Sequence, residues 1–133
     1  MAAKINKGTK TTKIVNIKQP ECLMHINMTK NNFRLTLTDY AGNVLHTETA
    51  GMVFKGSKKV TPHAASVTSE RMSRWALDRG VQSIQAKVNA QYLSSTGETS
   101  LRTLSHKGLN VLSIVNTTSI RHGGCKQRKA PRK

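Results

Sequence analysis

The sequence predicts an α/β fold: a mixed β-sheet with helices on its faces in three layers, and basic extensions at both ends. Apolar and polar residues alternate along three segments, as they do in half-buried strands. Two stretches with helical spacing separate the last strands of the chain. The order strand–strand–strand–helix–strand–helix–strand calls for right-handed crossovers fed by a meander, and this arrangement gives a mixed sheet.

The first three strands are expected to form an antiparallel meander. Residues 22–28 and 33–38 alternate between two faces, and residues 44–50 are rich in β-formers. Residues 30–32 and 39–43 have the composition of tight turns, and the second turn contains a glycine that is free to take a positive φ.

A loop over residues 51–61 leads into the first helix. Thr61 is a suitable N-cap, and Pro62 occupies the first helical position, where its missing N–H costs nothing. The helix is expected to end near Arg79, because Gly80 follows. Its core-facing stripe comprises Ala65, Met72, Trp75 and Ala76.

The rest of the body is predicted as strand, helix and strand. Residues 83–89 alternate again, and Ser95 with Glu98 fits a capping box for a short second helix. Gly108 followed by leucine resembles a Schellman ending. Residues 111–115 are almost continuously apolar, which is typical of a strand covered on both faces.

With 133 residues the chain is expected to hold one domain, divided into a basic extension (1–20), a globular body (21–119) and a basic tail (120–133). Its 22 Lys and Arg against 6 Asp and Glu give a net charge of +16. Self-repulsion at this charge favours a polyanionic partner. The sequence has no long apolar run and no basic amphipathic helix with an aromatic face, so nucleic acid is a better candidate than membrane.

Two cysteines are too few for a disulfide framework and indicate a reducing compartment. The first residues carry lysines where a secretory signal would carry an apolar core, and they are poorer in Arg and Ser than an organelle presequence. Five lysines and no acid precede residue 19, and RNA contact and a solvated tail are both consistent with that pattern.

From Arg121 onward, the C-terminal tail has neither an acidic residue nor a large apolar side chain. It cannot bury enough apolar surface to offset the entropy of ordering, and it therefore needs a polyanion to fold against. Its paired glycines let the backbone approach a ligand, and His122 can stack on a base or donate to phosphate. The residues expected to contact RNA are Arg121, His122, Gly123, Gly124, Lys126, Arg128, Lys129, Arg132 and Lys133.

A second basic element lies in the loop before the first helix. Lys55, Lys58 and Lys59 precede a helix N-terminus, whose free N–H groups favour phosphate. A solvated loop is the alternative. Few aromatic residues are available for stacking, so recognition is expected to depend on backbone and shape.

Catalytic, metal and cofactor sites are not expected. The six acids show no poised pair, and Asp39 lies in a turn, although a nuclease on this fold would depend on it. Cys22-x-x-His25 and His122-x-x-Cys125 have ligand-like spacing. Residues three apart on a strand point to opposite faces, however, so a buried Cys22 and a surface His25 are expected. No small-molecule substrate is indicated.

Several stretches together resemble the small-subunit ribosomal protein S-eleven family. They are Asn31-Asn32, the sequence Thr36-Leu37-Thr38-Asp39, Gly42-Asn43, Thr49-Ala50-Gly51, the run from Phe54 to Pro62, and Ile120-Arg121-His122-Gly123-Gly124-Cys125. The resemblance covers about residues 22–133, in the family's order and spacing.

The resemblance implies a ribonuclease H-like α/β sandwich without enzymatic activity. It implies a place on the platform of the small subunit, bound to ribosomal RNA near the messenger exit and touching neighbouring platform proteins, with messenger RNA nearby. Carried across, the RNA contacts in the body are Lys30, Asn31, Asn32, Lys55, Gly56, Ser57, Lys58 and Lys59.

The chain also departs from the family pattern. Residues 90–96 replace a glycine- and proline-rich turn, the loop 51–54 is a residue shorter, and Arg121 and Gly123 replace a proline and an asparagine. This drift points to an organellar, mitochondrial lineage, with a plastid or bacterial ribosome as the alternative. The alternative function is a free-standing architectural nucleic-acid binder, which would not sediment with small subunits.

Overall fold

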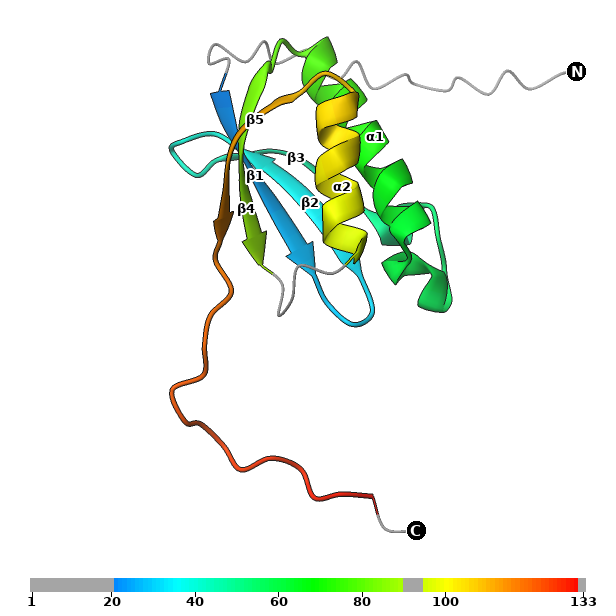
Figure 1. Ribbon diagram of the computed structural model, residues 1–133, viewed down its shortest axis with the longest axis vertical. Coiled ribbons are helices and arrows are strands. Elements are labelled where there is room, and N and C mark those ends of the chain that lie inside the picture. The colour runs from blue at the N-terminus through cyan, green and yellow to red at the C-terminus, as the bar shows by residue number, and fades with distance from the viewer. Residues whose placement is uncertain (1–20, 90–94, 132–133) are drawn as a thin grey trace, which may run out of the picture.

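The computed structural model describes residues 21–89 and 95–131, which form one sheet with two helices (Figure 1). The strands are β1 (Glu21–Met28), β2 (Phe33–Thr38), β3 (Val44–Thr49), β4 (Ser83–Asn89) and β5 (Asn110–Asn116). The helices are α1 (Pro62–Asp78) and α2 (Ser95–His106), and the loop before α1 contains two 3-10 turns, Ala50–Met52 and Gly56–Val60. The predictions for the lysines of residues 1–20 and for the turn at 90–94 fall outside the described residues.

The sheet is mixed, as predicted, with the strand order β3-β2-β1-β4-β5. The first three strands form the expected antiparallel meander, and β4 and β5 extend it in parallel to β1. Met24 of β1 is aligned with Leu37 of β2 and Ala86 of β4, so the apolar positions of neighbouring strands share one face.

Both helices pack on that apolar face (Figure 1). The chain crosses from β3 to β4 through α1, and then from β4 to β5 through α2, moving in the same direction along the sheet each time. Right-handed crossovers in one direction place their helices on the same side. The α/β class, the mixed sheet and the element order are therefore confirmed, while the described residues form two layers where the sequence predicted three.

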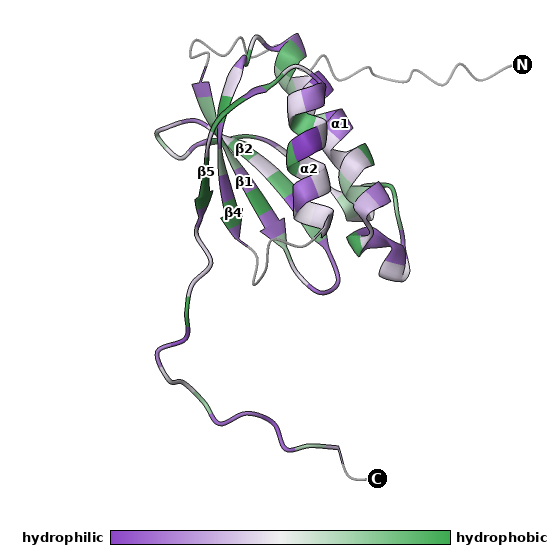
Figure 2. Cartoon of the chain, in the orientation of Figure 1, coloured by the Kyte–Doolittle hydropathy of each residue, from purple (hydrophilic) through white to green (hydrophobic). Residues whose placement is uncertain are grey.

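The core lies between the sheet and the two helices. Met24, Leu35 and Ile84 from the sheet are fully buried together with Met72 of α1 and Leu104 of α2. Each such side chain contributes about 1.5–3 kcal/mol by leaving water. Figure 2 shows hydrophobic and hydrophilic residues alternating along the strands, because the opposite face of the sheet is polar.

The prediction that residues 111–115 form a strand covered on both faces is wrong. β5 is an edge strand, and Leu112, Ile114 and Val115 are about half exposed (48, 57 and 46%). An apolar run shows that a strand has little polar surface, but strand order is decided by the crossovers. Two crossovers in one direction place the last strand at the edge.

The helix ends follow local sequence closely. The Thr61 hydroxyl oxygen accepts from the backbone N–H of Ala64. Gly80 and Gly108 both take positive φ, and the N–H of the residue after each reaches back to a carbonyl near the helix end, as in a Schellman motif.

The predicted capping box at Ser95 is not formed, because Ser95 already lies inside α2. Glu98 accepts from the Arg102 guanidinium instead, at 2.6 Å. Neither described helix is long and apolar enough to cross a membrane.

Candidate nucleic-acid interface

Three of the predicted RNA-contacting segments emerge at one end of the molecule. β1, β3, β4 and β5 run in the same direction, so their carboxyl ends share one edge of the sheet. The β1–β2 turn follows β1, the lysine-rich loop follows β3, and the C-terminal tail follows β5. Figure 1 shows these three segments at the lower end, together with the first turns of α1 and α2. We call this end of the molecule the basic edge; it lies at the carboxyl ends of four strands and is distinct from the lateral edges of the sheet formed by β3 and β5.

The β1–β2 turn is held by its own hydrogen bonds. The backbone N–H of Thr29 donates to the Asn32 carbonyl at 2.9 Å, and the Thr29 hydroxyl both donates to that carbonyl and accepts from the Asn32 N–H. Lys30 and Asn31 are fully exposed at the tip, whereas Asn32 is half-buried. A shallow pocket of about 350 Å³, lined by Asn27, Thr29, Asn32 and Arg34, adjoins the turn. Lys30 makes no ion pair with any described residue, so the turn presents this cation on a hydrogen-bonded base.

The lysine-rich loop packs against this turn at Gly51. A Cβ built on Gly51 would lie 3.6 Å from Lys59 Cδ and 3.9 Å from Asn32 Oδ1, so both side chains lean on this glycine. Lys59 is half-buried, because its stem lies on the body while its ammonium group reaches water. Lys55, Gly56, Ser57 and Lys58 are exposed. The structure thus joins two segments that the sequence placed more than twenty residues apart.

Two helix N-termini complete the basic edge. The Thr61 hydroxyl donates to the Lys58 carbonyl at 3.0 Å and also caps α1. The Thr96 hydroxyl in the first turn of α2 donates to the Val60 carbonyl at 3.0 Å and so ties this helix to the loop. The positive ends of both helix dipoles therefore lie beside the lysines, and they favour phosphate there.

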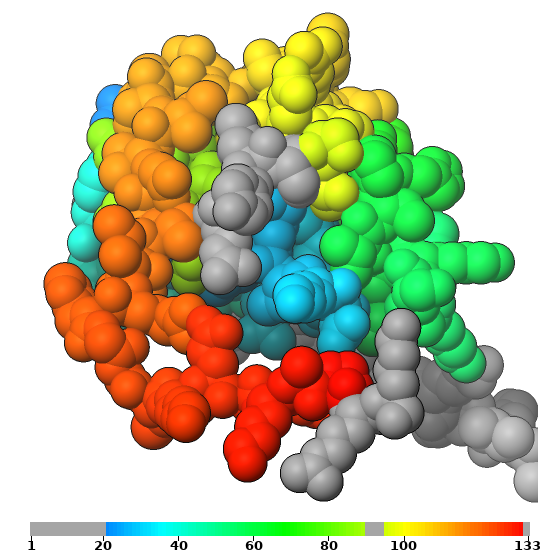
Figure 3. All heavy atoms as spheres, turned by 60° about the horizontal axis from the view of Figure 1, so that its bottom comes forward, coloured from blue at the N-terminus to red at the C-terminus, as the bar shows by residue number. Residues whose placement is uncertain are grey.

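The tail leaves the same edge. The backbone N–H of Thr117 donates to the carbonyl of Val88 at 2.9 Å and fixes the point of departure. Residues 121–131 are exposed and run away from the body (Figure 1). In the view onto this end, the β1–β2 turn lies between the tail and the loop that leads into α1 (Figure 3). Gly123 and Gly124 both have positive φ with open space around Cβ, so these glycines serve the backbone path and not close packing.

The charges of the basic edge are unpaired, unlike those of the helices. Within the described residues, no ion pair involves the lysines at 30, 55, 58 or 59 or the cations of the tail up to 129. The arginines at 71, 74 and 102 and the lysine at 107 each pair with a glutamate. Glu98 is the one acid in the first turns of α1 and α2, and Arg102 neutralises it. Arg132 and Lys133 lie outside the described residues.

Residues considered for metal binding lie apart. Cys22 is fully buried on the helix-covered face and His25 lies on the opposite face, as predicted, but His25 is half-buried where a surface position was expected. Burial raises the pKa of the Cys22 thiol, and Asp39 adds to this; burial and then Lys87 lower the pKa of His25. Among the described residues, no three His, Cys, Asp or Glu side chains come close enough to hold a metal ion.

Sequence reasoning missed the contacts that assemble the edge. The Thr96–Val60 hydrogen bond and the packing of Lys59 and Asn32 on Gly51 join residues that no local pattern connects. Arg74 pairs with Glu70 of its own helix at 3.7 Å, whereas Arg71 pairs with Glu48 of β3.

The fold and the clustered cations define a small basic α/β protein of the RNA-binding class. The model of the family described as "Ribosomal protein S11" matches residues 22–132. A protein named "Small ribosomal subunit protein uS11" from Methylobacterium radiotolerans is 41% identical over 109 residues, which cover 81% of this chain and 83% of that protein. Its namesake from Rhodopseudomonas palustris is 40% identical over 111 residues, covering 83% and 84%.

The chain therefore belongs to the ribosomal protein S11 family. Membership makes it a structural protein of the ribosome and not an enzyme. The resemblance deduced from the sequence is confirmed, and the organellar assignment stays a prediction.

Proposed function

We propose that this chain is a structural constituent of the small ribosomal subunit whose basic edge binds ribosomal RNA of the platform near the messenger exit. One observation carries the proposal: three basic segments, separate in sequence, emerge at one edge beside two helix N-termini. Unpaired lysines and free N–H groups bind phosphates without contacting base edges. Such contacts suit a protein that recognises folded RNA by its shape.

The roles within the edge follow from exposure. Lys30, Lys55 and Lys58 are exposed and supply charge, while Asn32 and Lys59 lean on Gly51 and hold turn and loop together. The tail residues from Arg121 onward neutralise further phosphates, and neighbouring platform proteins and messenger RNA lie nearby. A free-standing architectural DNA binder is not favoured, because the curated relatives are named as ribosomal proteins.

The proposal is tested by the salt dependence of binding to a small-subunit ribosomal RNA transcript. Replacing Lys30, Lys55 and Lys58 together with glutamine is expected to flatten the slope of log K against log salt by about 2 to 3, since each phosphate contact contributes about 0.7–0.9. The matched control replaces Arg74, Arg102 and Lys107 with glutamine. This variant loses the same amount of charge, but at residues that already pair with glutamates.

The control variant is expected to keep the original slope. Equal slopes for the two triple variants would show that net charge, and not the edge, determines binding, and the proposed interface would be wrong. Sedimentation of the native protein with small subunits in moderate salt separates a ribosomal constituent from a free-standing binder.

We further propose a mitochondrial ribosome as the compartment, with a plastid or bacterial ribosome as the alternative. Support comes from the departures from the family pattern at residues 90–96, Arg121 and Gly123. Recovery of the native chain in purified mitochondrial small subunits is the expected result, and recovery only elsewhere would contradict it.

A further inference from the structure

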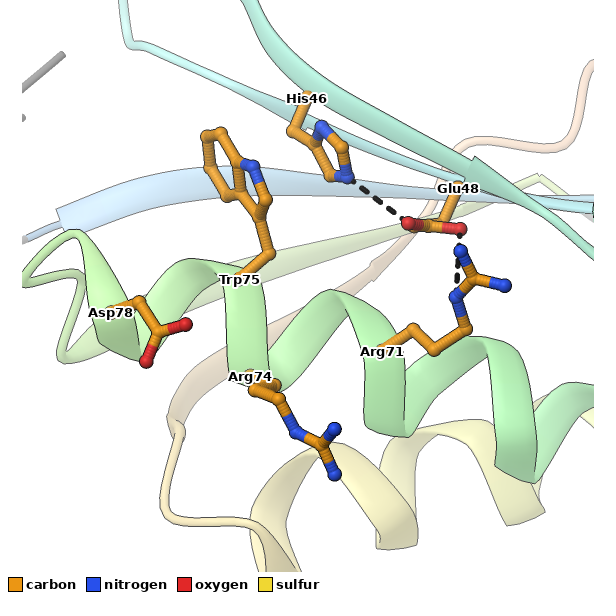
Figure 4. Close-up of a pocket in the computed structure, with 6 residues that line it drawn as sticks. All are labelled: His46, Glu48, Arg71, Arg74, Trp75 and Asp78. Carbon is orange, nitrogen blue, oxygen red and sulfur yellow. Dashed lines mark hydrogen bonds and ion pairs between the residues drawn. The ribbon is translucent and has the colours of Figure 1, made fainter. Parts of the chain in front are cut away.

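A second site lies where β3 faces α1, and its lining side chains come from these two elements (Figure 4). It is a pocket of about 280 Å³ between the edge strand β3 and the C-terminal half of α1. Its lining residues are His46, Glu48, Arg71, Arg74, Trp75 and Asp78. The pocket holds two of the six acidic residues of a chain with a net charge of +16.

The buried carboxylate of Glu48 is the main feature of this pocket. Glu48 is only 7% exposed, and its Oε1 lies 3.2 Å from His46 Nε2, within hydrogen-bonding distance. Oε2 lies 3.6 Å from Arg71 Nε, which is an ion-pair distance too long for a hydrogen bond. Oε2 is therefore a buried charged acceptor with no hydrogen bond from any described residue. Arg71 compensates the charge of Oε2 without a hydrogen bond, and a better-placed donor in its position would supply one.

The walls of the pocket are rigid. The ring of His46 stacks on that of Trp75 with centroids 4.3 Å apart and planes 6° apart. The Arg79 guanidinium carbon lies 3.9 Å from the centre of the Trp75 ring. Figure 4 shows His46 and Glu48 reaching from β3 toward side chains of α1. The missing donor thus belongs to a preformed site and not to a flexible surface.

The acids at both ends of the pocket determine which ligand fits. An anion would meet Glu48 at one end and Asp78 at the other, so phosphate is disfavoured. Arg74 is already engaged by Glu70 at 3.7 Å, which reduces the cationic character of the middle. An ammonium or guanidinium group supplies the strong, charge-assisted donor that a buried carboxylate binds best.

The position of β3 indicates which kind of partner segment can bring a basic side chain into the pocket. β3 lies at the end of the described sheet, and its outer backbone groups face no other described strand. An added strand would run about 4.8 Å beyond β3, and every second side chain would point onto the flank of α1. His46 and Glu48 are aligned with Leu37 and Leu35 and point to that same face.

We propose that the outer edge of β3 binds an extended segment of a partner protein, whose lysine or arginine enters this pocket, displaces the half-exposed Arg71 guanidinium beside Glu48 Oε2, and donates a hydrogen bond to this oxygen. The inference rests on the chain's place in a ribosomal particle, which supplies protein neighbours. The chain would then bind protein at the β3–α1 flank and RNA at the basic edge, and the residue that the partner inserts would be basic.

The test places a photo-cross-linking benzoylphenylalanine at Val44, which is 62% exposed on β3. The full-length variant is irradiated in living cells, so that cross-links form whether or not the chain later sediments with subunits. Cross-linked peptides are identified by mass spectrometry. The expected product is one segment of one ribosomal protein with a lysine or arginine close to the attachment point.

A second change shows whether the carboxylate is responsible. Glu48→Gln is expected to lower the yield from position 44 by about tenfold, because it removes the charge that the basic residue pairs with. The matched control, Glu98→Gln, neutralises an exposed glutamate on α2 that pairs with Arg102, and it is expected to leave the yield unchanged. Thermal unfolding of the purified Glu48→Gln protein checks that the body is intact, and Asp78→Asn at the exposed end of the pocket gives a weaker loss without a buried substitution.

Four outcomes would overturn the inference: cross-links to ribosomal RNA, cross-links to a second copy of this chain, no cross-link above the unirradiated level, or a yield that neither Glu48→Gln nor Asp78→Asn reduces. These outcomes are distinct from a failure of the proposed function, which would appear as absence of the chain from small subunits or as equal salt slopes for the two triple-glutamine variants.

Discussion

The basic edge and the β3–α1 flank use charge in opposite ways. At the edge, cations are exposed, unpaired within the described residues and close to helix N-termini. On the flank, Arg71 and Arg74 of α1 each pair with a carboxylate, Arg79 just after the helix contacts the Trp75 ring, and one carboxylate is buried. Unpaired surface charge lowers the stability of the free body but is available to phosphates, whereas paired charge fixes the shape of a site.

The difference teaches where each partner is recognised. Exposed lysines exchange their counterions for those of RNA and give affinity that depends on salt. The affinity of a partner for a buried carboxylate depends little on salt, because buried charges are screened much less than exposed ones. Salt therefore separates the two regions experimentally.

The largest effect is expected from the tail. Deleting residues 123–133 removes five cations and is expected to flatten the salt slope of RNA binding by about 3.5 to 4.5 if each reaches a phosphate. Filter binding at several salt concentrations measures the slope. A variant with the tail lysines changed to arginine keeps the charge and is expected to keep the slope. An unchanged slope after the deletion would mean that the tail makes no phosphate contact.

A smaller effect is expected at the N-cap of α1, where the two regions share one helix. Thr61→Val removes the hydroxyl that accepts from Ala64 and donates to Lys58, and is expected to cost about 1 kcal/mol of unfolding free energy. Urea denaturation measures the loss, and Thr61→Ser restores most of the stability. Because no charge changes, the salt slope stays as it was; a changed slope would show that loop geometry controls the phosphate contacts.

Much of this architecture is predictable from the sequence, because it depends on short-range chemistry. Alternation along residues 22–28 and 33–38, the Thr61 cap and the glycine after each helix all act within a few residues. The cations of the edge were predicted for the same reason, since a run of lysines without acids is visible in any short window.

The remainder depends on contacts between distant residues. The edge position of β5 follows from the direction of two crossovers, and the pocket at Glu48 requires β3 and α1 to meet. Trp75 was expected in the core, yet it is half-buried between His46 and Arg79, because an edge strand cannot cover the whole flank of α1. Neither feature has a signal in a single window of sequence.

The smallest effect concerns the open face of the sheet, which belongs to neither region. Burial and Lys87 hold the pKa of His25 below its ordinary value of 6.5. Above pH 6.5 His25 is neutral in both the folded and the unfolded chain. As the pH falls below 6.5, the unfolded chain takes up a proton first. The folded state therefore loses stability relative to the unfolded state. Denaturation midpoints between pH 7 and pH 5 are expected to fall less in His25→Gln and in Lys87→Met than in the unmodified protein. An unchanged pH dependence in both variants would show that other groups cause the loss.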